Sequence, residues 1–297
     1  MVFKRLLGSL GVGGPTVDTA LAPGAVLPGG GLSGEVRLRG GDTDFGIEHA
    51  ALELVARVEA EHEGGESYGV VVFDRFTVGG GFRLSAGEER GVPFSVTLPW
   101  ETPVTEMAVA GAKDKGDLDQ LTVGPLPVQE AVLESLGQLG FGFRSADLEN
   151  GRIGGTGQQL PFFQEIELTP APQYAHQVNE IELTFLASPG GMDVVLGADK
   201  RGGFFSEGRD TVTRFTVGHH DARDWNAEVD GWIRQLVEHR ASYGSHASYG
   251  PEGHRPGMGT AVAAGAAGLA VGVVGGMVAA EVVDEVGDFF EGDEEEE

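Results

Sequence analysis

The densest group of side chains able to bind a metal ion lies at His219, His220 and Asp221, with Asp224 shortly after them. Imidazole nitrogens and carboxylate oxygens are ligands of catalytic zinc, so one hypothesis is a metal-dependent hydrolase that uses His219 or His220. A metal site needs several donors that converge on one point, whereas adjacent side chains of an extended segment point to opposite faces. We therefore favour the alternative, a polar loop before a helix with no bound metal.

Other sequence motifs of enzymes are missing or incomplete. The chain has neither a phosphate-binding Gly-Lys-Ser/Thr motif nor a Gly-x-Ser-x-Gly nucleophile elbow. Gly11 and Gly13 lack the third glycine of a dinucleotide-binding loop, and the acidic run 114–119 lacks the glycine and final glutamate of a calcium loop. There is also no cysteine, which excludes disulfides and thiolate chemistry. We expect a protein that is not an enzyme and uses no cofactor.

The charge of the chain excludes some classes of partner. The formal net charge is -26, and residues 281–297 alone carry ten acids and no base. Nucleic acids and anionic lipid surfaces are bound through lysine and arginine, so this balance argues against both. The remaining expectation is that the partners are other proteins.

The elements that must position any site are mostly strands. Apolar side chains alternate with other residues at Leu52, Leu54, Ala56, Val58 and Ala60, which is the period of a half-buried strand. Further strands are expected at 17–26, 31–41, 70–78, 82–84, 92–98 and 117–123, separated by glycine- and proline-rich turns. Strands this close together favour an antiparallel sandwich or barrel. We assign residues 1–126 to this first domain.

A second strand-rich domain is expected at 127–240. A linker helix is expected at 128–139, where apolar residues recur at helical spacing, and Gly140 ends it. Strands follow at 161–170, 181–185, 192–196 and 212–217. A closing helix is expected at 222–239, with Asp221 as its N-cap and with Trp225 and Trp232 on an apolar stripe that packs into the core.

The last part of the chain differs in composition. We expect a flexible linker at 241–257 and a disordered acidic tail at 281–297. Residues 258–280 carry no charge and are long enough to cross a bilayer, and Gly268, Gly272 and Gly276 share one helical face that favours close helix–helix contact. A membrane-inserted helix, a self-associating soluble helix and a disordered segment all stay open.

The location follows from the charges beside this apolar run. Arginines precede residues 258–280 and only acids follow them, so a spanning helix would leave the domains in the cytoplasm, on the inner face of the membrane. Glycines interrupt the apolar residues near the N-terminus, and we do not expect a signal peptide there.

Several short motifs resemble those of the bacterial sporulation-control SpoOM family. They are Phe3-Lys4-Arg5-Leu6-Leu7, Thr16-Val17-Asp18-Thr19, Gly34-Glu35-Val36-Arg37-Leu38-Arg39-Gly40-Gly41, Val123-Gly124-Pro125-Leu126-Pro127 and Pro161-Phe162-Phe163-Gln164-Glu165-Ile166-Glu167. The resemblance covers roughly residues 1–236. It implies two arrestin-like β-sandwich domains joined by a hinge, in a regulator of sporulation or cell-cycle entry that acts through protein contacts without known catalysis.

We therefore expect a cytoplasmic, non-catalytic arrestin-like scaffold that docks partners at sheet edges or in the groove between its domains. One alternative is an envelope-associated structural protein that oligomerises through Gly268, Gly272 and Gly276. The metal-dependent hydrolase with His219 or His220 is the other alternative.

Overall fold

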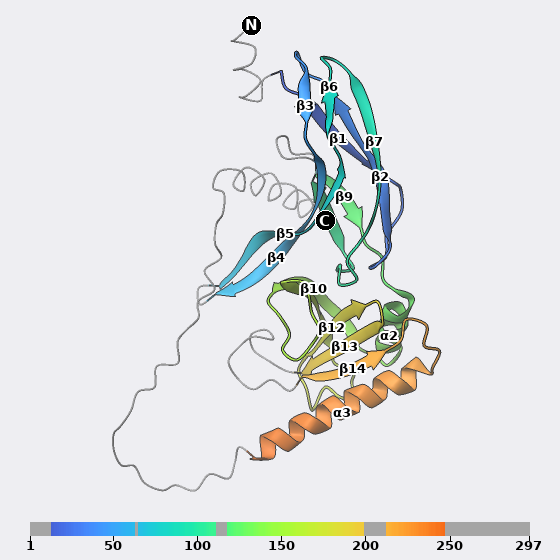
Figure 1. Ribbon diagram of the computed structural model, residues 1–297. Helices are drawn as coiled ribbons and strands as arrows, with labels where there is room; N and C mark the ends of the chain where they lie inside the picture. Colours follow the sequence, from blue (N-terminus) through green and yellow to red (C-terminus); the bar gives the residue numbers. More distant parts are fainter. Residues whose placement is uncertain (1–12, 63–64, 111–117, 199–211, 247–297) are drawn as a thin grey trace, which may run out of the picture.

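The computed structural model describes residues 13–62, 65–110, 118–198 and 212–246 (Figure 1). These residues form a mainly β protein with two domains in tandem, and helix α2 (Pro127–Gln138) lies where one domain passes into the other. The fold class agrees with the predicted pair of β domains, their linker helix and the helix that closes the second domain.

The first domain packs two sheets against each other. Strands β1 (Thr16–Leu21), β2 (Gly31–Arg39) and β7 (Glu89–Thr97) form one antiparallel sheet in the order β1-β2-β7. The facing strands are β4 (Ala50–His62), β5 (Gly65–Gly79), β8 (Glu106–Ala110) and β9 (Leu118–Thr122), and β3 (Phe45–Ile47) pairs with β6 (Phe82–Leu84). Leu52, Leu54, Ala56 and Val58 of β4 are almost fully buried in the core, as the alternation predicts, but Val55 on the other face is fully buried as well.

The second domain is one antiparallel sheet covered on one face by helices. Its strands are β10 (Gly142–Asn150), β11 (Phe162–Thr169), β12 (Ile181–Ser188), β13 (Gly191–Ala198) and β14 (Thr213–Val217), paired in chain order. Helices α2 and α3 (Trp225–His246) pack on the sheet, and Trp232 stacks on Phe215 of β14 with ring centroids 4.9 Å apart. Both tryptophans of α3 contact this core, as the helical stripe predicts.

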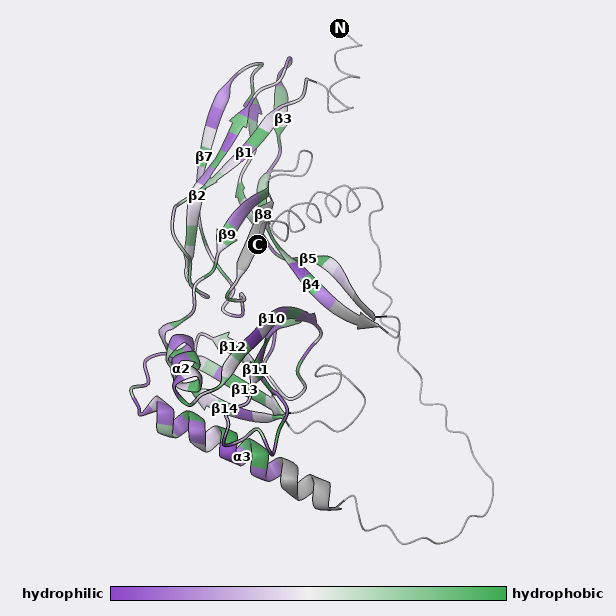
Figure 2. Ribbon diagram, turned by 180° about the vertical axis from the view of Figure 1, so that it is seen from behind, coloured by the Kyte–Doolittle hydropathy of each residue, from purple (hydrophilic) through white to green (hydrophobic). Residues whose placement is uncertain are grey.

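Strand β4 connects the two domains into one continuous sheet. It pairs with β5 along its length and with β8 near its start, and Glu59 near its end pairs in parallel with Glu149 of β10. The strand order is therefore β14-β13-β12-β11-β10-β4-β8-β9, with β5 added at the side of β4. The hairpin of β4 and β5 extends away from the sandwich in both views (Figures 1 and 2).

Three strands and one helix differ from the expectations. The short strands β3 and β8 are not among the expected strands. Strand β10 is not among them either, because a bulge between Phe143 and Ser145 interrupts its alternation and its residues are exposed or half-buried. Helix α3 runs from Trp225 to His246, so it starts later than expected and continues into the segment assigned to the linker.

Candidate functional site

Strand β5 is an exposed edge of the continuous sheet. Its register places Tyr68 opposite Glu59 and Val72 opposite Val55 of β4, and no other strand of the described residues pairs with it. The side chains of Tyr68 and Val72 are 54% and 44% exposed, and Val70 between them is half-buried. Natural proteins usually protect long edge strands with charges, prolines or covering loops. An edge that instead presents an apolar row is a candidate docking surface, and we call Tyr68, Val70 and Val72 the β5 patch.

The side chain of Tyr68 lies close to one cation and is influenced by two carboxylates. The guanidinium of Arg57 lies 4.2 Å from the centre of the ring, in a cation–π contact. Partial burial of the phenol raises the pKa of Tyr68 above its ordinary value, and the carboxylates of Glu59 and Asp147 raise it further. The phenol also donates a hydrogen bond to Glu59. The β5 patch therefore has a negative surrounding, although its own side chains are uncharged.

The junction between the domains is closed by side chains from both. Phe162, at the start of β11, is buried in the core of the first domain and meets the ring of Phe73 edge to face at 5.5 Å. The carboxylate of Glu101 accepts the backbone N–H groups of Gln159, at 2.7 Å, and of Leu160, at 2.8 Å. Gln164 donates from its side-chain amide to the carbonyl of Val104 at 3.0 Å.

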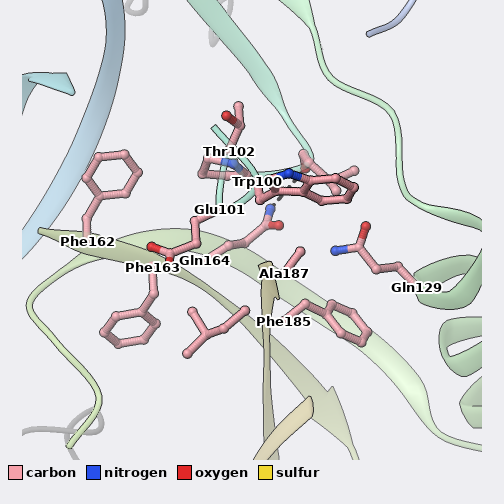
Figure 3. Close-up of a pocket in the computed structure, with 12 residues that line it drawn as sticks. Trp100, Glu101, Thr102, Gln129, Phe162, Phe163, Gln164, Phe185 and Ala187 are labelled. Atoms are coloured by element: carbon pink, nitrogen blue, oxygen red, sulfur yellow. Dashed lines mark hydrogen bonds between the residues drawn. The ribbon is translucent and has the colours of Figure 1, made fainter. Parts of the chain in front are cut away.

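Little free space remains in this junction. The cavity lined by Trp100, Glu101, Phe163 and Gln164 measures about 10 Å³ (Figure 3). That volume is about what one water molecule needs. The interdomain groove expected as a docking surface is therefore filled at this point, and the edge of β5 is the better candidate.

The structure places His219 in a packing contact. Its ring stacks on the indole of Trp100, and its Nε2 lies 2.7 Å from the carbonyl oxygen of Ser188 and donates to it. His220 next to it is exposed, and both histidines lie in a turn after β14 and not in an extended segment. Among the residues that the structure describes, no three histidine or acidic side chains form a group that could hold a metal ion. This geometry favours the polar-loop interpretation.

The two acids near His219 serve the backbone. Asp221 accepts the N–H of Gly218 at 3.0 Å, and this bond, together with Arg223, lowers the pKa of Asp221 below its ordinary value. Asp224 accepts the N–H of Ala227 at 3.2 Å and so caps α3. The prediction that Asp221 is the N-cap was wrong, because Asp221 closes the preceding turn instead.

Other predicted features lie outside the described residues. Gly268, Gly272 and Gly276, and the whole run 258–280, belong to the part of the chain that the structure does not describe, so the helix–helix contact stays a prediction. Within the described part, none of the helices is long and apolar enough to be a membrane span.

Sequence reasoning missed the residues that form the β5 patch and the junction. The strand at 70–78 was expected, but its edge position and the exposure of Tyr68 depend on the strand order. Trp100 follows Pro99 in a loop, where no periodicity points to it. A tryptophan in such a loop is itself a signal, because large aromatic side chains are rarely left in water.

These features define a two-domain, mainly β protein with a closed interdomain junction and an open edge strand. Residues 3–202 match the family model described as SpoOM protein, and the chain belongs to the SpoOM family. It is 34% identical over 210 residues to the sporulation-control protein Spo0M of Bacillus subtilis (strain 168), a match that covers 67% of this chain and 81% of that protein.

A solved structure agrees with this assignment. The crystal structure of Spo0M, sporulation control protein, from Bacillus subtilis aligns with a TM-score of 0.63 and 28% sequence identity. The alignment covers 80% of this chain and 100% of that chain. The residues that follow 202, which include β14 and α3, lie beyond the segment matched by the family model.

Proposed function

We propose that this chain is a non-catalytic, arrestin-like scaffold in the control of sporulation, and that it acts by binding protein partners at the β5 patch. Membership of the SpoOM family and the name of the Bacillus relative support the regulatory role. The observation that carries the docking mode is the exposed apolar row on an edge strand with one neighbouring strand in the described part of the chain. Strand addition at such an edge is a common way for sheets to bind extended segments.

The geometry of the junction supports a scaffold that presents this edge in a fixed direction. Phe162 of the second domain packs into the first core, and Glu101 of the first domain binds backbone N–H groups of the second. Strand β4 belongs to the sheet of both domains, so β5, which pairs with β4, is held in place by the strand that connects the domains. No cofactor enters this proposal.

Complementation tests the regulatory role. A Bacillus subtilis strain that lacks its own Spo0M would receive this chain, and heat-resistant spores would be counted. Restored spore counts are the expected result. A normally folded and expressed chain that leaves spore formation at the level of the deletion strain would reject the role in sporulation control.

We extend the proposal to the tail, with residues 258–280 as a membrane tether that holds the domains at the inner face of the membrane. The support is the uncharged length of this run. Cell fractionation of the full chain and of a chain that ends at residue 257 tests it. The full chain is expected in the membrane fraction and the shortened chain in the soluble one; a full chain that is wholly soluble removes the tether.

A further inference from the structure

The β5 patch has a charge pattern that restricts its partner, and this inference rests on the function proposed above. The register places Arg57, Glu59 and Tyr68 on one face of the hairpin, because Glu59 lies opposite Tyr68 and Arg57 opposite Val70. Glu149 of β10 pairs with Glu59, and Asp147 is close enough to act on the phenol of Tyr68. Apart from the ion pair of Arg75 with Glu53 further along the hairpin, this face therefore carries three carboxylates and one guanidinium around an exposed apolar row.

The guanidinium of Arg57 does not cancel this charge at the edge, and that of Arg75 is already paired with Glu53. Arg57 lies over the ring of Tyr68, on the β4 side of the patch. An added strand would lie about 5 Å beyond β5, so it would be roughly 10 Å from Glu59 of β4 and roughly 15 Å from Asp147 and Glu149 of β10. The shorter distance is close to the Debye length at about 0.1 M salt, so an incoming segment experiences mainly the charge of Glu59, with a weaker, screened contribution from Asp147 and Glu149.

The backbone and the side chains at this edge select an extended segment. Alternate N–H and C=O groups of an edge strand point away from its single neighbour, and they need a partner in the same extended conformation. Tyr68, Val70 and Val72 recur with the strand period, so they match apolar side chains at every second position of such a partner. A helix presents its side chains at a different spacing and would leave the backbone N–H and C=O groups at the edge of β5 without hydrogen-bond partners.

We infer that β5 accepts a basic, extended segment of a partner protein as an added strand, with apolar side chains on the β5 patch and lysine or arginine in the negative field of Glu59, Asp147 and Glu149. An acidic segment is repelled by these carboxylates and by the net charge of -26 of the whole chain. The inference goes beyond a general protein scaffold because it names the conformation and the charge of the partner.

Three labelled peptides of about nine residues, the usual upper length of a strand, test this inference on the full chain. One alternates valine with lysine, the second alternates valine with glutamate, and the third is the lysine peptide with a central proline that removes a ladder donor. Fluorescence anisotropy should show binding of the lysine peptide, and binding at least about tenfold weaker for each of the other two. Equal binding of the lysine and glutamate peptides would overturn the charge selection.

Two substitutions at one exposed position separate charge from shape. Val72→Lys adds a cation to the edge and should weaken the lysine peptide about tenfold, whereas Val72→Glu should leave its binding unchanged or tighter. Phe143→Lys is the matched control, because Phe143 is 70% exposed on β10 of the second domain. Equal losses in Val72→Lys and Val72→Glu would reject the charge argument, and an equal loss in the control would reject the site.

Hydrogen exchange locates the bound peptide. Slower exchange of amides in β5 is expected when the lysine peptide is present, and protection confined to another element would overturn the inference. Sedimentation of the free protein tests the competing occupant: a dimer that Val72→Lys separates would assign the edge to a second copy of the chain. Complementation by the full chain without peptide binding rejects only this inference, whereas peptide binding without complementation rejects only the role in sporulation.

Discussion

The indole of Trp100 stacks on the imidazole of His219, with ring centroids 4.7 Å apart and ring planes inclined by 27°. Trp100 belongs to the loop after β7 in the first domain, and His219 to the loop between β14 and α3 in the second. This stacking contact between an indole and a metal-capable imidazole therefore joins the two domains. This contact explains His219 without a metal and makes the loop 98–105 the centre of the interdomain junction.

A substitution at Gly29 tests how tightly the indole of Trp100 is held. A Cβ at this position would lie 2.4 Å from the indole, and the φ angle of Gly29 is +70°. Gly29→Ala should lower the free energy of unfolding by about 3 kcal/mol, because backbone strain and displacement of the ring act together. Urea denaturation of the full chain measures this change.

Gly81 offers a control with nearly the same backbone. Its φ angle is +73°, but nothing lies within 4 Å of an added Cβ. Gly81→Ala should cost about 1 kcal/mol from backbone strain alone. Equal losses in the two variants would show that the indole yields freely and that the junction is looser than its contacts indicate.

Glu101 should control the local stability of the junction. Its carboxylate accepts backbone N–H groups of Gln159 and Leu160, and bonds to a charged acceptor are stronger than neutral ones. Glu101→Gln should cost about 1–2 kcal/mol and speed the amide exchange of Gln159 and Leu160. Glu48→Gln, at an exposed carboxylate after β3, should change neither quantity by a comparable amount.

Amide hydrogen exchange can also contradict this role of Glu101. If the amides of Gln159 and Leu160 exchange at the same rate in both variants, the carboxylate of Glu101 does not protect them. A loss of stability without faster exchange at these two amides would place the effect of the substitution elsewhere in the loop.

The sequence predicted where strands form better than it predicted which strands lie side by side. The alternation from Leu52 to Val58 is a local property, because each side chain needs only the strand conformation to reach the core. Phe162 looks equally apolar whether it packs in its own domain or in the other one, and its place in the first core follows from strand order. The edge position of β5 is likewise a property of topology, which no local pattern encodes.

The residues of the candidate site likewise differ in whether the sequence alone points to them. The sequence drew attention to His219 because imidazole chemistry can be recognised from residue type, but the partner that decides its role, Trp100, is distant in the chain. Tyr68 gave no such signal, since its exposure and its acidic surrounding arise from β4 and β10 together. Long-range pairing of this kind needs the structure.

Trp100→Ala should loosen the contact between the domains. The indole is half-buried against the core of the second domain, so its removal should cost about 2–3 kcal/mol, somewhat less than a fully buried tryptophan. Faster amide exchange in residues 158–164 is expected in addition to the lower urea midpoint. Trp225→Ala is the matched control, because Trp225 also packs half-buried on this core but lies on α3, away from the junction. Comparable acceleration at 158–164 in both variants would contradict a specific role for Trp100.

Asp44 should make the first domain sensitive to acid. Its carboxylate accepts the N–H of Ala86 at 2.9 Å and binds the guanidinium of Arg83 at 2.6 Å. These two bonds, the backbone one first, lower the pKa of Asp44 below its ordinary value. A carboxyl group with a lowered pKa in the folded state adds stability above the unfolded pKa of about 3.9, and this stability is lost as the pH falls through the folded pKa. Asp44→Asn should therefore lower the urea midpoint at about pH 6 and have a shrinking effect below about pH 4.

The pH series separates this ionic effect from a simple loss of packing. At about pH 6 the aspartate is charged and holds the turn that follows β6, whereas at about pH 2–3 it approaches the neutral form that asparagine imitates. The midpoints of wild type and variant should therefore converge as the pH falls, and they should also approach each other in high salt, because Arg83 is largely exposed. A difference between the two midpoints that stays constant from pH 6 to the acid limit would mean that the charge of Asp44 contributes nothing and that its hydrogen bonds act equally well without it.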